Sequence, residues 1–166
     1  MLGSVLVFST MDALVKWLSA DYPTWQIMFF RSSVALVPIA IFVAMAGGWQ
    51  VLRTRRPMLH ALRSLIGVSA MGCAFYGIGQ LPLADAMAIF HAAPILMTAL
   101  SVPLLGERVG IRRWSAVVIG FLGVLLVVKP GSDVFSHGAL YMMAAAFFVG
   151  LGTNLIRILT RTEDPA

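Results

Sequence analysis

The sequence has 166 residues, of which 60% are hydrophobic and 11% are charged, and its mean hydropathy is +0.91. Soluble domains contain about 45–50% apolar and about 25% charged residues, and one small core could not bury this surplus, so the composition excludes a water-soluble protein. The net charge of +5 comes from basic residues in short clusters between apolar runs, which indicates membrane topology and not a nucleic-acid-binding stripe.

Six apolar stretches are long enough to cross about 30 Å of hydrocarbon as helices. In chain order they cover residues 1–19, 25–46, 61–80, 83–105, 113–130 and 138–158. The connections between them are short and carry turn residues, so neighbouring helices are expected to run antiparallel. The sequence therefore predicts an all-α, polytopic transmembrane helix bundle. A secretory signal peptide is the alternative for the first twenty residues, but Asp12 and Lys16 interrupt that apolar run and no basic segment precedes it.

Lysine and arginine are distributed unequally between the two ends of the predicted bundle. One set of connections carries most of the 12 basic residues: Arg53, Arg55, Arg56, Arg63, Arg108, Arg112, Arg113, Arg157 and Arg161. The opposite connections carry Asp21, Asp133 and only Lys129. Because cytoplasmic loops are enriched in positive charge, the amino terminus is predicted to face the cytoplasm.

A weak internal repeat relates the two ends of the chain. At an offset of 142 residues, Asp12 is aligned with Asn154. Since five spans separate the two copies, the sixth span must run opposite to the first, which is the inverted arrangement of many secondary transporters. Residues 1–130 are therefore expected to form a first five-helix repeat, and residues 131–166 the start of an inverted second repeat, truncated after one span.

Ionisable side chains inside the spans cost about 2.5–3.5 kcal/mol each on insertion scales, so each one needs a reason. Asp12 and Lys16 lie one turn apart on the first span, and Arg31 lies near the start of the second. In one interpretation, these residues form the charged wall of a solute cavity, in which Arg31 binds a carboxylate. In the other, Asp12 and Lys16 neutralise each other, and the long side chains of Lys16 and Arg31 extend to the membrane surface.

Polar residues on later spans extend this candidate site. Tyr76 and Gln80 on the third span can stack on and hydrogen-bond a planar solute, or belong to the interfacial aromatic belt. His91 precedes Pro94 in the fourth span, where the proline frees a backbone carbonyl; proton coupling, substrate binding and an ordinary hydrogen bond to a neighbouring helix are all open readings. Asn154 on the sixth span is expected to line the cavity from its inner side.

The spans differ in the polar side chains that they could contribute to a cavity. Residues 117–128 of the fifth span include no polar side chain, so this helix is expected to pack outside the cavity. By contrast, Asp12, Lys16, Arg31 and His91 reach similar depths in the outer-middle part of the bilayer. We expect these four to surround one aqueous cavity, with Asp12 and Arg31 in direct or water-bridged contact.

Several short motifs resemble a known transporter family. They are residues 12–17 (Asp-Ala-Leu-Val-Lys-Trp) with Arg31, residues 81–86 (Leu-Pro-Leu-Ala-Asp-Ala), Pro94, residues 105–108 (Leu-Gly-Glu-Arg), residues 113–114 (Arg-Trp), residues 120–124 (Gly-Phe-Leu-Gly-Val) and residues 129–131 (Lys-Pro-Gly). Over almost its whole length the chain resembles the EamA family of the drug/metabolite transporter superfamily. The resemblance implies two inverted five-helix repeats around a central cavity and transport of metabolites such as amino acids, riboflavin or S-adenosylmethionine. The chain departs from that pattern in length, since four expected helices are missing.

These features predict a secondary-type transporter of a small metabolite that works by alternating access in a bacterial inner membrane. The sequence carries no nucleophile–base pair, no metal-ligand spacing and no cofactor motif, so an enzyme is not expected and no cofactor is predicted. The expected partners are a small-molecule substrate and the lipid bilayer, without nucleic acid, and a homo-oligomer is left open. The alternatives are a truncated fragment that does not transport and a membrane structural subunit, which would not need intramembrane charges.

Overall fold

The computed structural model describes residues 2–46, 56–107, 109–128 and 137–162. Within these ranges every regular element is an α-helix, which confirms the predicted all-α membrane bundle. In chain order the helices are α1 (Leu2–Leu18), α2 (Thr24–Met45), α3 (Pro57–Gln80), α4 (Leu83–Phe90), α5 (Ala93–Leu105), α6 (Ile111–Val128) and α7 (His137–Thr162). Of the residues that carried sequence predictions, Arg53, Arg55, Arg108, Lys129–Gly131 and Asp133 lie outside the described ranges.

Four helical stretches of the described chain are long and apolar enough to cross a membrane: Thr24–Met45, Pro57–Gln80, Leu83–Leu105 and His137–Thr160. The two remaining helices, α1 and α6, have 17 and 18 residues. At about 1.5 Å per residue, helices of that length come within a few ångströms of the roughly 30 Å hydrocarbon core. These six helical passages correspond to the six predicted spans.

The fourth span is broken near its middle, where one continuous helix was expected. α4 ends at Phe90, and α5 begins at Ala93 with Pro94 in its first turn. A proline ring clashes with the carbonyl four residues earlier and offers no N–H, so the helix stops before it and restarts at it. His91 closes the end of α4, since its Nδ1 lies 2.6 Å from the carbonyl oxygen of Met87. Because a carbonyl only accepts hydrogen bonds, Nδ1 carries a proton in this contact.

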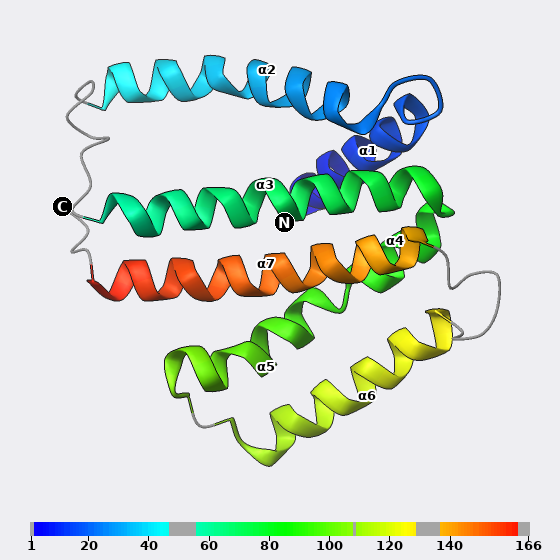
Figure 1. The fold of residues 1–166 in the computed structure, drawn as a ribbon, viewed down its shortest axis with the longest axis vertical. Helices are drawn as coiled ribbons and strands as arrows, with labels where there is room; N and C mark the ends of the chain where they lie inside the picture. Colours follow the sequence, from blue (N-terminus) through cyan, green and yellow to red (C-terminus); the bar gives the residue numbers. More distant parts are fainter. Residues whose placement is uncertain (1, 47–55, 108, 129–136, 163–166) are drawn as a thin grey trace.

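The antiparallel helices α3 and α7 form the centre of the bundle (Figure 1). Small residues let their backbones approach closely: a Cβ at Gly77 would lie 2.5 Å from Cγ of Met142 and 3.1 Å from the carbonyl oxygen of Gly138. α7 meets α5 in the same way, because a Cβ at Gly150 would lie 2.9 Å from the backbone nitrogen of Met97. Close approach through small residues is the usual basis of helix association in membranes.

The outer helices leave large apolar surfaces uncovered. α2 lies on one side of α3, and α6 lies at the far edge of the molecule beside α5 (Figure 1). Phe29, Phe30 and Phe42 on α2 are 60–70% exposed, as are Ile119 and Leu126 on α6 at 69% and 75%. Such apolar patches are far larger than a soluble monomer tolerates and suit contact with lipid or with further membrane helices.

Candidate substrate site

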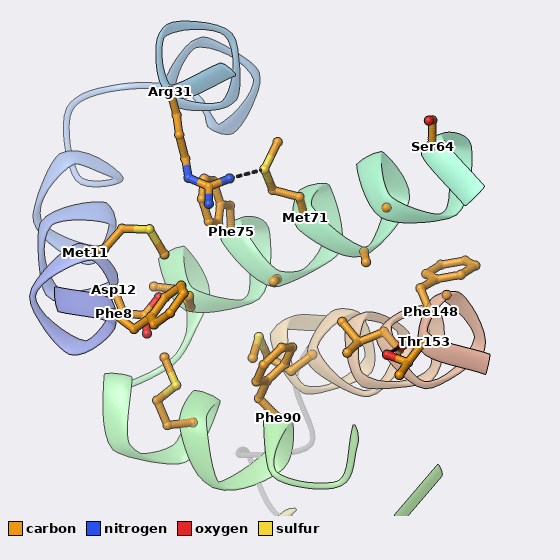
Figure 2. A pocket seen from close by; sticks show the side chains of 18 of the residues that line it. Phe8, Met11, Asp12, Arg31, Ser64, Met71, Phe75, Phe90, Phe148 and Thr153 are labelled. Atoms are coloured by element: carbon orange, nitrogen blue, oxygen red, sulfur yellow. Dashed lines mark hydrogen bonds between the residues drawn. The ribbon is translucent and has the colours of Figure 1, made fainter. Parts of the chain in front are cut away.

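A cavity of about 600 Å³ opens between α1, α2, α3, α4 and α7 (Figure 2). Its volume falls in the range of roughly 300–1,000 Å³ that is typical of small-molecule sites. Phenylalanine rings and thioethers dominate its wall: Phe8, Phe75, Phe90, Phe148, Met11, Met71, Met87 and Met142. The charged residues in the wall are Asp12, Arg31 and Arg63.

The cavity extends along most of α3. Its lining residues on that helix run from Arg63 to Ile78. At about 1.5 Å per residue this stretch covers about 22 Å, most of the thickness of the hydrocarbon core. Arg63 therefore marks one end of the cavity, whereas Phe75 and Ile78 mark the other.

Arg31 extends from α2 into the cavity, where a thioether and an aromatic ring contact its guanidinium group (Figure 2). Its Nη1 donates a hydrogen bond of 2.7 Å to the sulfur of Met71, and its guanidinium carbon lies 5.6 Å from the centroid of the Phe75 ring. A thioether is a weak acceptor and a ring face attracts a cation only moderately, so neither neutralises the positive charge. Within the described chain, Arg31 forms no ion pair with a carboxylate.

Asp12 projects from α1 into the same cavity, next to Phe8 (Figure 2). The carboxylate is partly buried and feels the positive charge of Arg31. The two side chains do not form an ion pair in the residues described, so of the expected direct or water-bridged contact the direct form is not made. Asp12 and Arg31 are thus two opposite charges on separate walls of one cavity.

Lys16 lies elsewhere, although it is one turn from Asp12 along α1. Its ammonium group donates hydrogen bonds to the carbonyl oxygens of Gly79, at 3.0 Å, and Leu81, at 2.7 Å. The last carbonyls of a helix have no partner within that helix, so a cation is well placed there both as a donor and against the helix dipole. Lys16 therefore caps α3 and is not part of the cavity wall.

Tyr76 and Gln80 also lie away from the cavity. The ring of Tyr76 packs on the ring of Tyr141, with centroids 4.4 Å apart. Gln80 is the exposed last residue of α3. The helix turns the face that carries Ala70, Ala74 and Ile78 toward the cavity instead.

Asn154 is fully buried where α7 crosses α5. Its Nδ2 donates hydrogen bonds to the carbonyl oxygens of Met97, at 2.9 Å, and Gly150, at 3.1 Å. Its Oδ1 finds no hydrogen-bond partner among the described residues. Asn154 therefore joins two helices beside the close approach of Gly150 and does not line the cavity.

His91 lines a second cavity of about 340 Å³ at the break in the fourth span. Phe90, Val149 and Thr153 line both cavities and so form the partition between them. This arrangement corrects the expectation that four ionisable residues surround one space. Asp12 and Arg31 share the first cavity, His91 lines the second, and Lys16 is bonded to the end of α3.

The apolar wall of the cavity and the position of Arg63 at one of its ends are not evident from the sequence pattern. Phe8 lies one helical turn before Asp12, and this spacing could have placed the ring beside the carboxylate. Arg63 was attributed to the cytoplasmic cluster, although it also reaches the cavity. The fifth span meets its prediction, since α6 contributes no described residue to either cavity.

The sequence of the chain matches a known protein family over most of its length. The profile of the EamA-like transporter family matches residues 1–129. The chain belongs to the EamA-like transporter family. It is accordingly an integral membrane protein, and relatives of it are named as transporters of small molecules.

Curated relatives of the chain include three transporters of different small molecules. The S-adenosylmethionine uptake transporter of Rickettsia prowazekii is 31% identical over 86% of this chain and 48% of its own length. The pseudopaline exporter CntI of Pseudomonas aeruginosa is 34% identical over 93% of this chain and 54% of its own. A riboflavin transporter of Vibrio cholerae is 25% identical over 100% of this chain and 57% of its own.

The chain therefore spans about half the length of the curated relatives it matches. No solved structure matches it significantly.

Proposed function

We propose that the protein carries a small metabolite across the membrane as a secondary-type transporter, by alternating access around the first cavity. The observation that supports this most directly is that Asp12 and Arg31, two opposite charges, line one cavity of about 600 Å³ between membrane-spanning helices. Intramembrane charges are costly and mark substrate pathways in membrane proteins. The names of the relatives, which include S-adenosylmethionine, pseudopaline and riboflavin transporters, support a metabolite as the cargo.

The site residues of this proposal are Asp12 and Arg31, with Arg63 at the opposite end of the cavity. His91 belongs to the proposal through the second cavity, which it lines together with residues of the partition. Lys16 and Asn154 are proposed to hold helices in place. We assign Tyr76 and Gln80 no contact with the substrate.

We further propose that the protein resides in a bacterial inner membrane with its amino terminus in the cytoplasm. Among the described residues, Arg56 and Arg63 lie at and near the start of α3, Arg112 and Arg113 near the start of α6, and Arg157 near the end of α7, so all lie toward the same end of the antiparallel bundle. Arg157 also lies 3.8 Å from a carboxylate oxygen of Glu107. Positive charge at one end favours placing that end in the cytoplasm.

The repeat organisation is also a proposal. α1–α6 would form one five-span repeat over residues 1–130, and α7 would be the first helix of an inverted second repeat in residues 131–166. The opposite directions of α1 and α7 suit this reading (Figure 1). Residues of both helices line the first cavity.

The transport proposal is tested by comparing metabolites inside and outside cells that express the protein, an Asp12→Asn variant or neither. The expected result is that at least one metabolite is redistributed by the protein and that Asp12→Asn abolishes the difference at equal membrane abundance. Arg112→Gln, an exposed position away from both cavities, is the control and should behave as wild type. An unchanged metabolite profile, or full activity of Asp12→Asn, would contradict the proposal.

A further inference from the structure

The first cavity is open at one end and closed at the other. Near its open end it is lined by exposed residues of α3 and α7, which are Arg63, Ser64, Gly67 and Ile156. At the opposite end its lining on α3 stops at Ile78, which is 3% exposed. With the proposed topology, the cavity in this conformation is therefore open toward the cytoplasm and closed toward the outside.

At the closed end, the hairpin of α1 and α2 packs against the rest of the bundle. Among the described side chains of α1 and α2, only Val15 and Ile27 are buried, and both lie close to the turn that joins the two helices. The buried cluster to which they belong includes Phe75, Ile78 and Leu81. Because no other described side chain of α1 or α2 is fully buried, the hairpin is held mainly at its outer end.

Lys16 adds a charged contact at the same end. Its hydrogen bonds to the carbonyl oxygens of Gly79 and Leu81 join the last turn of α1 to the end of α3. Ser19, directly after α1, lies against the same segment, because a Cβ at Gly79 would be 3.4 Å from the Cβ of Ser19. Hydrogen bonds from a charged donor are stronger than neutral ones, and carbonyls at membrane depth need a partner. The ammonium group can therefore leave these carbonyls only when water replaces it.

The helices on the other side of the cavity are packed too closely to provide the movement. A Cβ at Gly77 would lie 2.5 Å from Cγ of Met142, toward the end of α3. A Cβ at Gly152 of α7 would lie 3.5 Å from the side chain of Ile66, toward the start of α3. Helices in contact over most of their length move as one body, because a packed interface does not deform continuously. α3 and α7 are thus the fixed part against which the hairpin can move.

We propose that α1 and α2 form the outer gate of the first cavity and that Lys16 holds this gate closed. When the hairpin moves away from α3, the ammonium group and the two carbonyls become hydrated, and Asp12 and Arg31 face the outer solution. The contacts that close the gate are few, so small free-energy differences of the kind that separate conformations of one protein are sufficient to open it. The inference rests on the proposed transport function and topology, and it identifies the element that moves. Lys16 is a positioning residue in it, without contact to the solute.

A disulfide between α1 and α3 tests whether the hairpin must move. In a Cys73→Ser background, the Cβ atoms of Ser19→Cys and Gly79→Cys would be 3.4 Å apart, close to the separation of about 3.5–4.5 Å found in disulfides. Oxidation with copper phenanthroline should form the cross-link and abolish the redistribution of metabolites by expressing cells, and dithiothreitol should restore it. Each single-cysteine variant should act as wild type under both conditions. Failure of the cross-link to form, or full activity of the cross-linked protein, would overturn the inference.

Thiol labelling of intact cells tests the part played by Lys16 without any solute. Ile78→Cys in the Cys73→Ser background lies beneath the gate, so an impermeant maleimide added outside should label it slowly. Lys16→Met should raise the labelling rate at least about fivefold, since two charged hydrogen bonds are lost, and Lys16→Arg should raise it less. Thr10→Ala is the matched control on α1, because the Thr10 hydroxyl bonds only within its own helix, to the carbonyl of Leu6. Equal labelling rates in Lys16→Met and wild type would overturn the inference.

A second cysteine position separates opening of the gate from unfolding. Ala145 on α7 is fully buried and lines neither cavity, so Ala145→Cys should remain unlabelled whether Lys16 is present or replaced by methionine. If Lys16→Met exposes Ala145→Cys as much as Ile78→Cys, Lys16 serves general stability and the inference is overturned.

Failure of the inference differs from failure of the proposed function. If cells with the cross-linked protein still redistribute metabolites, the assignment of the gate is wrong while transport stands. If wild-type cells redistribute no metabolite, the transport proposal fails, and the labelling rates of Ile78→Cys still decide whether Lys16 holds the outer end closed.

Discussion

The ammonium group of Lys16 on α1 donates a 2.7 Å hydrogen bond to the carbonyl oxygen of Leu81, just beyond the end of α3. The same nitrogen reaches the carbonyl of Gly79 at 3.0 Å. One intramembrane cation thereby satisfies two carbonyls that the helix leaves without partners. It also fixes α1 against α3 at the end of the cavity where Asp12 lies.

Replacing Lys16 should therefore affect stability more than substrate recognition. Lys16→Met keeps the length and removes the donor, so two carbonyls lose a charged partner at a cost of about 1–3 kcal/mol. We expect a lower thermal unfolding midpoint in detergent and an unchanged order of affinities among charged solutes. Lys16→Arg, which keeps a cation, should lose less. If Lys16→Met unfolds like wild type but reverses the preference between solutes, the residue would belong to the substrate site instead.

The crossing of α5 and α7 should be sensitive to a single methyl group. In Gly150→Ala the new Cβ would lie 2.9 Å from the backbone nitrogen of Met97, and backbone cannot move aside as a side chain can. Overpacking of this kind costs about 1–3 kcal/mol. Gly123→Ala is the matched control, because a Cβ there meets nothing within 4 Å. Thermal unfolding of the two variants should differ clearly; equal midpoints would mean that the helices are farther apart at this crossing.

Rings in the cavity and rings at the periphery should contribute differently to transport. Phe8 lines the cavity and is 61% exposed, so Phe8→Ala should leave the fold intact while it weakens solute binding by about tenfold. Phe121 on α6 is 39% exposed and lines neither cavity, so Phe121→Ala should transport as wild type. Transport is measured in proteoliposomes at matched protein content. Loss of activity in Phe121→Ala alone would return α6 to the substrate path.

The proposed topology can be checked with single cysteines in a Cys73→Ser background. Tyr22, between α1 and α2, and Met58, at the start of α3, are 48% and 84% exposed and lie at opposite ends of the bundle. With the amino terminus in the cytoplasm, an impermeant thiol reagent added to intact cells should label Tyr22→Cys and leave Met58→Cys unmodified. Labelling of Met58→Cys alone would invert the assignment.

The primary sequence was sufficient for the class of protein, the number of helical passages and the family. Runs of apolar residues longer than about 17 can be stable only in lipid, and the short polar breaks between them set the helix ends. Even the peripheral position of α6 followed from its side chains, because residues 117–128 include no polar group that could line a polar cavity.

Local pattern could not assign the individual polar residues, because their partners are distant in the chain. Asp12 and Lys16 share a helix face four residues apart, yet one lines the cavity and the other bonds to carbonyls 63 and 65 residues away. Asn154 is likewise paired with Met97, 57 residues earlier. A backbone carbonyl has no signature in the sequence, so which side chain it binds depends on how the helices pack, and that packing is set by close contacts such as those at Gly77 and Gly150.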